Sequence, residues 1–300
     1  GSAYPIEFIT SRIYNFEISS IYPDDKDDKY EVSDKLLEDY SSSSYIIFNG
    51  NEEKENGYVY KMFNKNNKLK IIDASSSLTY KNKIEEIWLD PANFLTMAYN
   101  VKEGFKEYIS TTYITNDIQS NYDKLKVELM QLEADYRETA NRANRKNIIV
   151  ADDLFLFLNK YGINVISLEQ SKIFTKKAQY NAEELIKNGE ILYIYKKKGQ
   201  EENEIIKNLK ENYEVKILEL DTLYTLSSEQ RQSNKNYFDI MYERAEVIDI
   251  IIDDAYRNKG YGNILFNDAL KDIEKNSKYI FIIGKLHRQK KNKEETYESG

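Results

Sequence analysis

Cysteine is absent from the 300-residue chain, and histidine occurs once, at His287 in a basic tail. The lack of cysteine excludes disulfides, thiolate metal sites and a cysteine nucleophile. No apolar run reaches the roughly 18 residues of a membrane-spanning helix, and no secretory leader is recognisable. Because Gly1-Ser2-Ala3 is typical of a cloning remnant, the missing leader does not bear on localisation.

Positive charge is not in excess either. The chain has 43 Lys and Arg against 51 Asp and Glu, and its net charge of -8 argues against a nucleic-acid-binding surface. What is present is 41% hydrophobic residues, enough to build a sizeable core in one large or two medium domains. The 26 tyrosines are scattered, which favours a composition bias over an aromatic ligand surface.

Short apolar runs alternate with helical patterns in both halves of the chain, which is typical of βαβ units and a parallel sheet. The pattern predicts strands at 16–21, 45–48, 69–72, 148–150, 165–168, 191–195 and 215–220. It predicts helices at 6–13, 33–40, 58–63, 153–161, 181–187 and 201–212, with Gly162 as a C-terminal cap.

Residues 117–144 carry the clearest helical pattern. Their apolar positions form one stripe: Ile118, Tyr122, Leu125, Leu129, Leu132, Tyr136 and Ala140. At about 1.5 Å per residue, such a helix spans roughly 40 Å, the width of a domain. A coiled-coil arm would give the same pattern, but the flanking α/β segments favour a helix that links two lobes. The predicted fold class is therefore α/β, with two lobes, one long backbone helix and a ligand cleft between the lobes.

The segment Ile87-Trp88-Leu89-Asp90-Pro91-Ala92-Asn93, followed by Met97-Ala98-Tyr99-Asn100, resembles the signature of the metal-binding lipoproteins that serve zinc and manganese ABC importers. Further segments resemble the same family in the same order: 28–33, 45–50, 70–75, 148–166, 193–196, 220–223 and 236–241. The resemblance covers about residues 4–248. Tyr4-Pro5 resembles the loop after the family's first strand, so that strand is missing or truncated here.

The resemblance implies three metal-ligand positions, at which this chain has Asp28, Glu86 and Asp152 in place of histidine. If these carboxylates converge, they suit calcium, magnesium or manganese better than zinc. Lys196 lies near the position of the family's final acidic ligand, where it opposes a cation or pairs with the carboxylates. Three interpretations stay open: a lost site, which we favour, a rebuilt divalent-metal site, and a site for a non-metal ligand.

The tail resembles a different family. The strand pattern at 248–252 and the segment Arg257-Asn258-Lys259-Gly260-Tyr261-Gly262 resemble the central motif of GNAT acetyltransferases. That resemblance implies an acetyl-CoA pyrophosphate site at Arg257, Lys259, Gly260, Tyr261, Gly262 and Asn263. A complete acetyltransferase domain is much longer than residues 246–300, so we expect no such activity from this fragment alone.

These observations predict an N-terminal α/β lobe at 1–115, a linking helix at 116–146, a C-terminal α/β lobe at 147–245 and a GNAT-like fragment at 246–300. The predicted function is that of an extracytoplasmic solute-binding protein and monomeric surface lipoprotein, with an ABC permease as partner and an altered, histidine-free site. The alternatives are a cytoplasmic acetyltransferase fragment and a non-transport surface interaction protein. Neither nucleic acid nor a catalytic residue is predicted.

Overall fold

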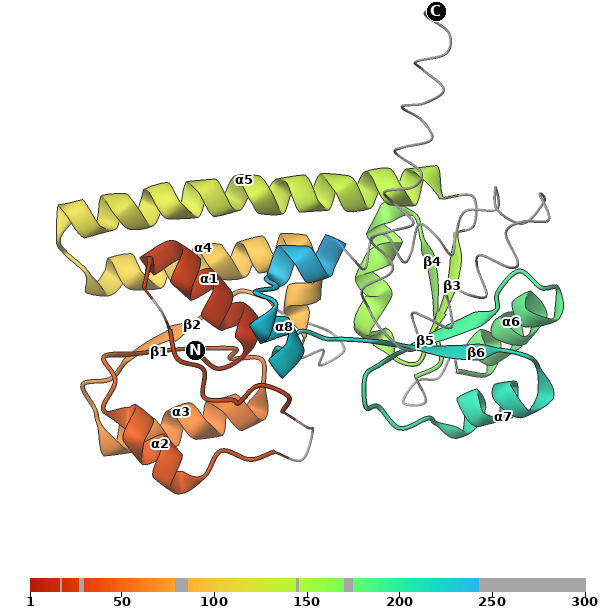
Figure 1. The fold of residues 1–300 in the computed structure, drawn as a ribbon, viewed down its shortest axis with the longest axis horizontal. Helices are drawn as coiled ribbons and strands as arrows, with labels where there is room; N and C mark the ends of the chain where they lie inside the picture. Colours follow the sequence, from red (N-terminus) through yellow and green to blue (C-terminus); the bar gives the residue numbers. More distant parts are fainter. Residues whose placement is uncertain (17, 27–29, 79–85, 144–145, 170–174, 243–300) are drawn as a thin grey trace, which may run out of the picture.

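The computed structural model describes residues 1–16, 18–26, 30–78, 86–143, 146–169 and 175–242 (Figure 1). The GNAT-like segment with Arg257, Lys259, Gly260, Tyr261, Gly262 and Asn263 lies outside these residues, and so does Asp28. The predicted α/β class with two lobes is confirmed, because each half of the described chain contains its own parallel sheet. The boundaries 1–115, 116–146 and 147–245 remain our proposal for dividing the chain.

The N-terminal lobe is built on a two-stranded parallel sheet, β1 (Tyr45–Phe48) and β2 (Lys70–Asp73). Its helices are α1 (Tyr4–Tyr14), α2 (Asp34–Ser41), α3 (Glu53–Lys65) and α4 (Pro91–Tyr108). Ser33 begins α2 as predicted, since its side chain accepts a hydrogen bond from the Leu36 amide.

The strand predicted at 16–21 is wrong for its described residues, which form no strand. The chain leaves α1 through Asn15 in the left-handed conformation (φ 58°), and Phe16 points into solvent. The Gly1 amine donates to the carbonyl of Ser19 at 2.8 Å and the amide of Ile21 donates to the carbonyl of Gly1 at 3.0 Å, but these two bonds do not extend into a regular ladder in the described residues. A high β propensity therefore gave no strand here, because no neighbouring strand pairs with the segment.

The C-terminal lobe contains a four-stranded parallel sheet in the order β4-β3-β5-β6. The strands are β3 (Asn147–Val150), β4 (Asn164–Ser167), β5 (Tyr193–Lys197) and β6 (Lys216–Leu220). The connecting helices are η2 (Asp153–Tyr161), α6 (Thr175–Lys187) and α7 (Glu204–Asn212). Gly162 ends η2 in the left-handed conformation (φ 86°), as predicted, although η2 is a 3₁₀ helix and not an α-helix.

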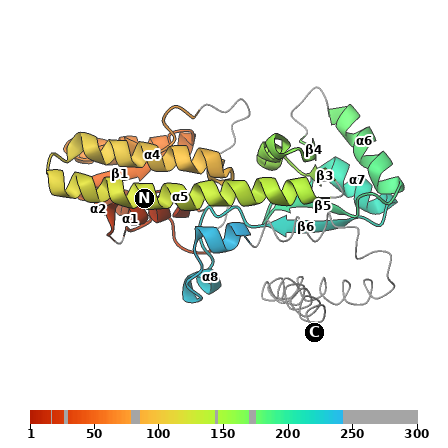
Figure 2. The ribbon, with the colours of Figure 1, turned by 90° about the horizontal axis from the view of Figure 1, so that it is seen from above.

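Helix α5 (Thr112–Arg142) runs along both lobes (Figures 1 and 2). Its predicted apolar stripe is buried in the core cluster that also contains Trp88 of the N-terminal lobe and Val150 of the C-terminal lobe. The coiled-coil-arm alternative is wrong, because a protruding arm would not share this core. No helix in the described part of the chain is long and apolar enough to cross a membrane.

A second connection between the lobes follows β6. Residues 221–226, which we call the return segment, lead back to the N-terminal lobe before α8 (Ser228–Gln232). The indole N–H of Trp88 donates to the carbonyl of Thr222 at 2.8 Å, and the amide of Tyr4 donates to the carbonyl of Tyr224 at 2.9 Å. The hydroxyl of Tyr237 donates to the carbonyl of Trp88 at 2.6 Å. Trp88 is therefore hydrogen-bonded to residues on both sides of α8, to Thr222 before it and to Tyr237 after it.

Candidate functional site

The signature around Trp88 builds a rigid turn at the junction of the lobes. Ile87–Leu89 form a short 3₁₀ helix, η1, and Asp90 then caps α4 by accepting a hydrogen bond from the Ala92 amide at 3.0 Å. Pro91 fits the first turn of α4, where no amide proton is needed. The Trp88 side chain is fully buried. These residues fix the backbone at Glu86, which directly precedes η1.

Glu86 is buried and faces the other lobe. Its Oε1 lies 3.4 Å from Nζ of Lys197, which ends β5. Burial raises the pKa of the Glu86 carboxyl, the Lys197 charge opposes that rise, and the charge of Asp152 adds to it. The position at which the family resemblance implies a metal ligand is thus occupied by an ion pair between the lobes.

Asp152 is held by two hydrogen bonds. Its Oδ1 accepts from the Leu154 amide at 2.8 Å and so begins η2, and its Oδ2 accepts from Nε2 of Gln200 at 3.0 Å. Oε1 of Gln200 in turn accepts from the backbone amide of Lys197 at 3.2 Å. Asp152, Gln200 and Lys197 therefore form one polar network, which meets Glu86 through the lysine.

The structure brings two of the three predicted carboxylates into this network, Glu86 and Asp152. The third, Asp28, lies outside the described residues. Among the residues that the structure describes, no group of three His, Cys, Asp or Glu side chains is placed to hold a metal ion. The expectation that Lys196 enters the site is wrong, because its Nζ instead contacts Glu219 at 2.8 Å and the Gln200 carbonyl at 2.6 Å.

Lys197 is the site residue that the sequence reasoning missed. Successive side chains of a strand point to opposite faces, so Lys196 and Lys197 on β5 cannot both face Glu86. Lys196 lies opposite Glu219 in the register of β5 and β6 and pairs with it across the strands. The two-residue period of the strand was the available signal, but its phase depended on a neighbouring strand that the sequence alone does not place.

A second ionic contact between the lobes lies beside the first. Nζ of Lys160, on η2, contacts Oδ1 of Asp90 and lies 3.7 Å from Oε1 of Glu133 on α5. Asp90 therefore both caps α4 and binds the C-terminal lobe. Together with the pair of Lys197 and Glu86, this contact joins the lobes at the positions where the sequence resemblance implies metal ligands.

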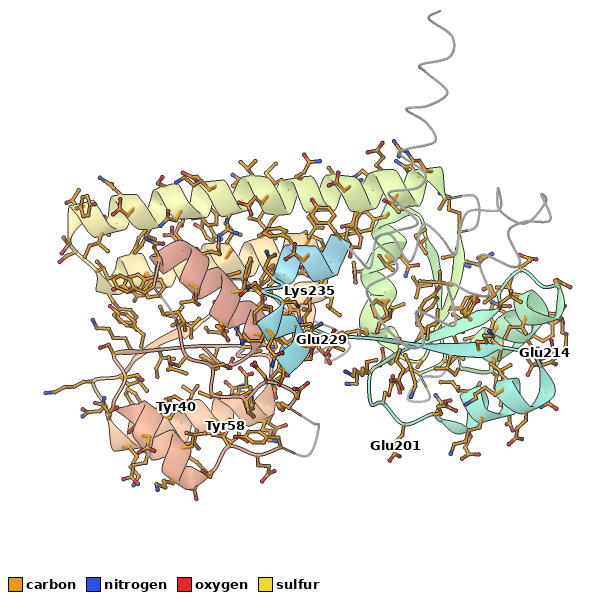
Figure 3. All side chains as sticks on the ribbon, in the orientation of Figure 1. Tyr40, Tyr58, Glu201, Glu214, Glu229 and Lys235 are labelled. Atoms are coloured by element: carbon orange, nitrogen blue, oxygen red, sulfur yellow. The ribbon has the colours of Figure 1, made fainter. Side chains whose placement is uncertain are left out.

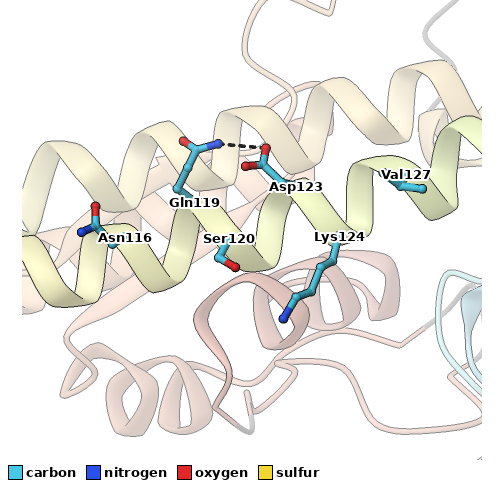
Figure 4. Close-up of a pocket in the computed structure, with 6 residues that line it drawn as sticks. All are labelled: Asn116, Gln119, Ser120, Asp123, Lys124 and Val127. Carbon is cyan, nitrogen blue, oxygen red and sulfur yellow. Dashed lines mark hydrogen bonds between the residues drawn. The ribbon is translucent and has the colours of Figure 1, made fainter.

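A surface hollow of about 570 Å³ lies away from this junction, along the outer side of α5 (Figure 4). Its lining residues are Asn116, Gln119, Ser120, Asp123, Lys124 and Val127, all from α5. A single helix face open to solvent does not enclose a small ligand. We therefore place the candidate site at the lobe junction.

Two parallel-sheet lobes, a long helix along both and a polar network at their junction define the class of two-lobed solute-binding proteins. A family model described as "Zinc-uptake complex component A periplasmic" matches residues 1–249. The chain belongs to this family. It is a substrate-binding protein of the metal ABC-importer class, and it has no histidine in the matched region. The word periplasmic in the family description agrees with the predicted extracytoplasmic localisation.

Solved structures show the same fold. The Zn(II)-bound ZnuA-like domain of AdcA from Streptococcus pneumoniae is 16% identical, with a TM-score of 0.66, over 84% of this chain and 97% of that one. The metal-dependent lipoprotein YcdH from Bacillus subtilis is 17% identical, with a TM-score of 0.66, over 83% and 96% of the two chains.

The laminin-binding protein Lbp of Streptococcus pyogenes is 16% identical, with a TM-score of 0.66, over 84% of this chain and 97% of that one. The comparison with curated proteins gave no match. The GNAT resemblance of the tail receives no support from the comparisons, and the family match ends at residue 249.

Proposed function

We propose that this protein is an extracytoplasmic solute-binding protein in which a lysine ammonium has replaced a transition metal as the cation between the lobes. The observation that carries the proposal is the contact between Lys197 Nζ and Glu86 Oε1 at 3.4 Å. It joins β5 of one lobe to the turn before η1 of the other. The protein would then hold its two lobes together without carrying zinc or manganese.

The donor set supports this proposal. Zinc sites in proteins use neutral imidazole, thiolate and carboxylate ligands, and the matched region of this chain offers neither histidine nor cysteine. Of the carboxylates, Asp152 already accepts bonds from Leu154 and Gln200, while Glu86 faces a positive charge. A divalent cation would have to displace the ammonium and would be repelled by it.

The family membership suggests the setting in which this arrangement acts. We propose that the protein is monomeric, is tethered by a lipid anchor and docks to an ABC permease. With the lobes already held by their own ion pair, docking would not depend on a bound metal. Copurification of the protein with a permease, at equal yield with added zinc or a chelator, would support this part of the proposal.

Titration calorimetry with zinc, manganese and calcium tests the site itself. We expect no micromolar binding to the unaltered protein, or weak binding that Glu86→Ala leaves unchanged. The matched control is Glu219→Ala, because Glu219 of β6 is also a glutamate paired with a lysine of β5 but lies on the opposite face of the sheet from Lys197.

The outcome that overturns the proposal is micromolar binding of any of these ions that Glu86→Ala abolishes and Glu219→Ala preserves. Such a result would establish a rebuilt metal site with Glu86 as a ligand. The same titration on Asp28→Ala then decides whether the third predicted carboxylate completes that site.

A further inference from the structure

A second acidic cluster is buried in the N-terminal lobe, away from the lobe junction. Glu52 precedes α3 and Glu55 lies in its first turn, and the Glu55 side chain has 0% exposure. Tyr224, in the return segment, places its hydroxyl between them. Its Oη contacts Oε2 of Glu52 and lies 3.0 Å from Oε1 of Glu55. Three oxygen atoms from two distant parts of the chain are thus within hydrogen-bonding distance.

If both glutamates are ionised, the two contacts of Tyr224 have only one proton between them, and one of the contacts cannot be a hydrogen bond. Each of the two contacts needs its own hydrogen, but the Tyr224 phenol supplies only one. Burial raises the pKa of Tyr224, so the phenol keeps its proton and donates it to one carboxylate. The other contact becomes a hydrogen bond only if that glutamate is itself protonated.

Glu55 is the glutamate that fits the protonated role. It is the more deeply buried of the two, and no lysine or arginine pairs with it in the described residues. Its Oε1 can then donate to Tyr224, which in turn donates to Glu52, while its Oε2 accepts from the Asn49 amide at 2.8 Å. Every oxygen in this chain of contacts has a partner of the right kind.

The positive groups around the cluster do not replace this proton. Nζ of Lys26 lies over the ring faces of Tyr224 and Tyr22, at 4.3 and 5.0 Å from their centroids. The Gly1 amine is near Glu55 and Glu7, but its hydrogen bond goes to the Ser19 carbonyl at 2.8 Å and to neither carboxylate.

The remaining neighbours are hydroxyl groups. Tyr58 of α3, which is labelled in Figure 3, accepts a hydrogen bond from the Val32 amide at 3.2 Å. Ser2 Oγ and Tyr22 Oη are buried and do not meet the geometry of a hydrogen bond among the described residues, but Ser2 lies close enough to Glu55 to oppose the rise of its pKa, and Tyr22 lies close to Tyr224. Both lie near Glu55, and they are the groups that could turn toward it if it loses its proton.

We propose that Glu52, Tyr224 and Glu55 form a proton-binding site in which a proton held by Glu55 at neutral pH fastens the return segment to α3. In the described residues, the return segment connects the C-terminal lobe back to the N-terminal lobe. Protonation of Glu55 therefore strengthens the attachment of this segment to α3. A proton is the smallest ligand that neutralises one of two adjacent buried carboxylates.

The direction of the pH effect follows from the environment of Glu55. Burial, and then the charge of Glu52, raise the pKa of Glu55 well above its usual value. A raised folded-state pKa means that the folded protein binds the proton more tightly than the unfolded chain does. The stabilisation is therefore complete below the unfolded pKa and is lost as pH rises through the folded pKa.

Infrared spectroscopy tests the proposal directly. At neutral pH we expect the carbonyl-stretch band of a buried protonated carboxylic acid, and we expect alkaline titration to remove it. Glu55→Gln should abolish the band, whereas Glu53→Gln should leave it, since Glu53 is an exposed glutamate of the same helix. If Glu55→Gln does not fold, Glu52→Gln serves instead, because loss of the neighbouring charge should let the band disappear at a lower pH.

Thermal unfolding measured between about pH 5 and 9 gives an independent readout. The unaltered protein should lose stability as pH rises, and Glu55→Gln should flatten that fall while Glu53→Gln preserves it. A folded protein without the band at neutral pH overturns the proposal, and so does a band that persists in Glu55→Gln. Loss of the band on adding sodium or calcium at constant pH would also overturn it, by making the cluster a cation site.

Discussion

Glu86 and Glu55 are both buried glutamates of the N-terminal lobe, and each contacts a residue from a much later part of the chain. Glu86 meets Lys197 of β5 at 3.4 Å, whereas Glu55 meets the Tyr224 hydroxyl at 3.0 Å. One carboxylate is neutralised by a cation from the opposite lobe and the other, by our inference, by a proton. The same residue type thus joins distant segments by two different chemistries.

Access to water explains the difference. The Lys197 side chain is 31% exposed, so its aliphatic part can cross the junction while the ammonium keeps some hydration. Glu55 has 0% exposure, and a lysine brought to that depth would lose its hydration entirely. The depth of burial of the carboxylate therefore decides whether an ion pair or a shared proton neutralises it. A buried acidic residue alone does not identify a metal site.

The largest expected effect comes from removing the cation of the first pair. Lys197→Met leaves the Glu86 carboxylate buried without its partner. Breaking a fully buried pair costs about 3–5 kcal/mol, and the partial exposure of Lys197 reduces the expected loss to about 2 kcal/mol. Urea unfolding at neutral pH measures this change in the free energy of unfolding.

Two further variants sharpen that result. Adding Glu86→Gln to Lys197→Met should restore stability to within about 1 kcal/mol of the original, since no charge is then left unpaired. Lys210→Met is the control, because its ion pair with Glu202 at 2.8 Å lies away from the junction and its side chain is 41% exposed, so losing that pair should cost about 1 kcal/mol or less. An equal loss in the free energy of unfolding for the two lysine variants would mean that the pair at the lobe junction contributes no more to stability than an ordinary surface ion pair.

The sequence predicted the helices and their ends better than it predicted the side-chain contacts of the two glutamates. Ser33 as a helix cap, Gly162 as a helix end and the buried stripe from Ile118 to Ala140 were all predicted from local patterns and confirmed. Each depends on residues within one or two helical turns, where sequence spacing and spatial distance agree. The segment at 16–21 failed because a strand also needs a partner strand.

The site was predicted in part, for the same reason. Glu86 and Asp152 were identified through the family resemblance and do meet in one network. The error of one position between Lys196 and Lys197 moved the predicted side chain to the wrong face of β5. The contact of Tyr224 with Glu55 joins residues 169 positions apart and has no local pattern that could have predicted it.

A smaller effect is expected at the second glutamate. Tyr224→Phe removes the hydroxyl that bridges Glu52 and Glu55, and it leaves two buried oxygens without a partner. We expect a loss of about 1 kcal/mol in the free energy of unfolding at neutral pH. Tyr161→Phe is the control, because its buried hydroxyl makes no hydrogen bond in the described part of the chain and its loss should change stability by about 0.5 kcal/mol at most.

A larger loss of stability in Tyr161→Phe than in Tyr224→Phe would remove the bridging role of Tyr224. A loss of the expected size in Tyr224→Phe that also disappears in the Glu55→Gln background would tie the cost to the same contact. Double-mutant analysis of the two substitutions measures that coupling.

The smallest expected effect is the change of coupling energy with salt concentration. It distinguishes an ion pair from a hydrogen bond between neutral groups more directly than the other tests. Raising the ionic strength to about 1 M shortens the Debye length to about 3 Å, which screens a partly exposed ion pair but not a hydrogen bond between neutral buried groups. The coupling energy of Lys197 and Glu86, from a double-mutant cycle, should fall by a few tenths of a kcal/mol between low and high salt. The coupling of Tyr224 and Glu55 should stay constant at a pH where Glu55 is protonated. A salt-dependent coupling at Glu55 would instead require an ionised carboxylate there, and the two glutamates would then share one mechanism.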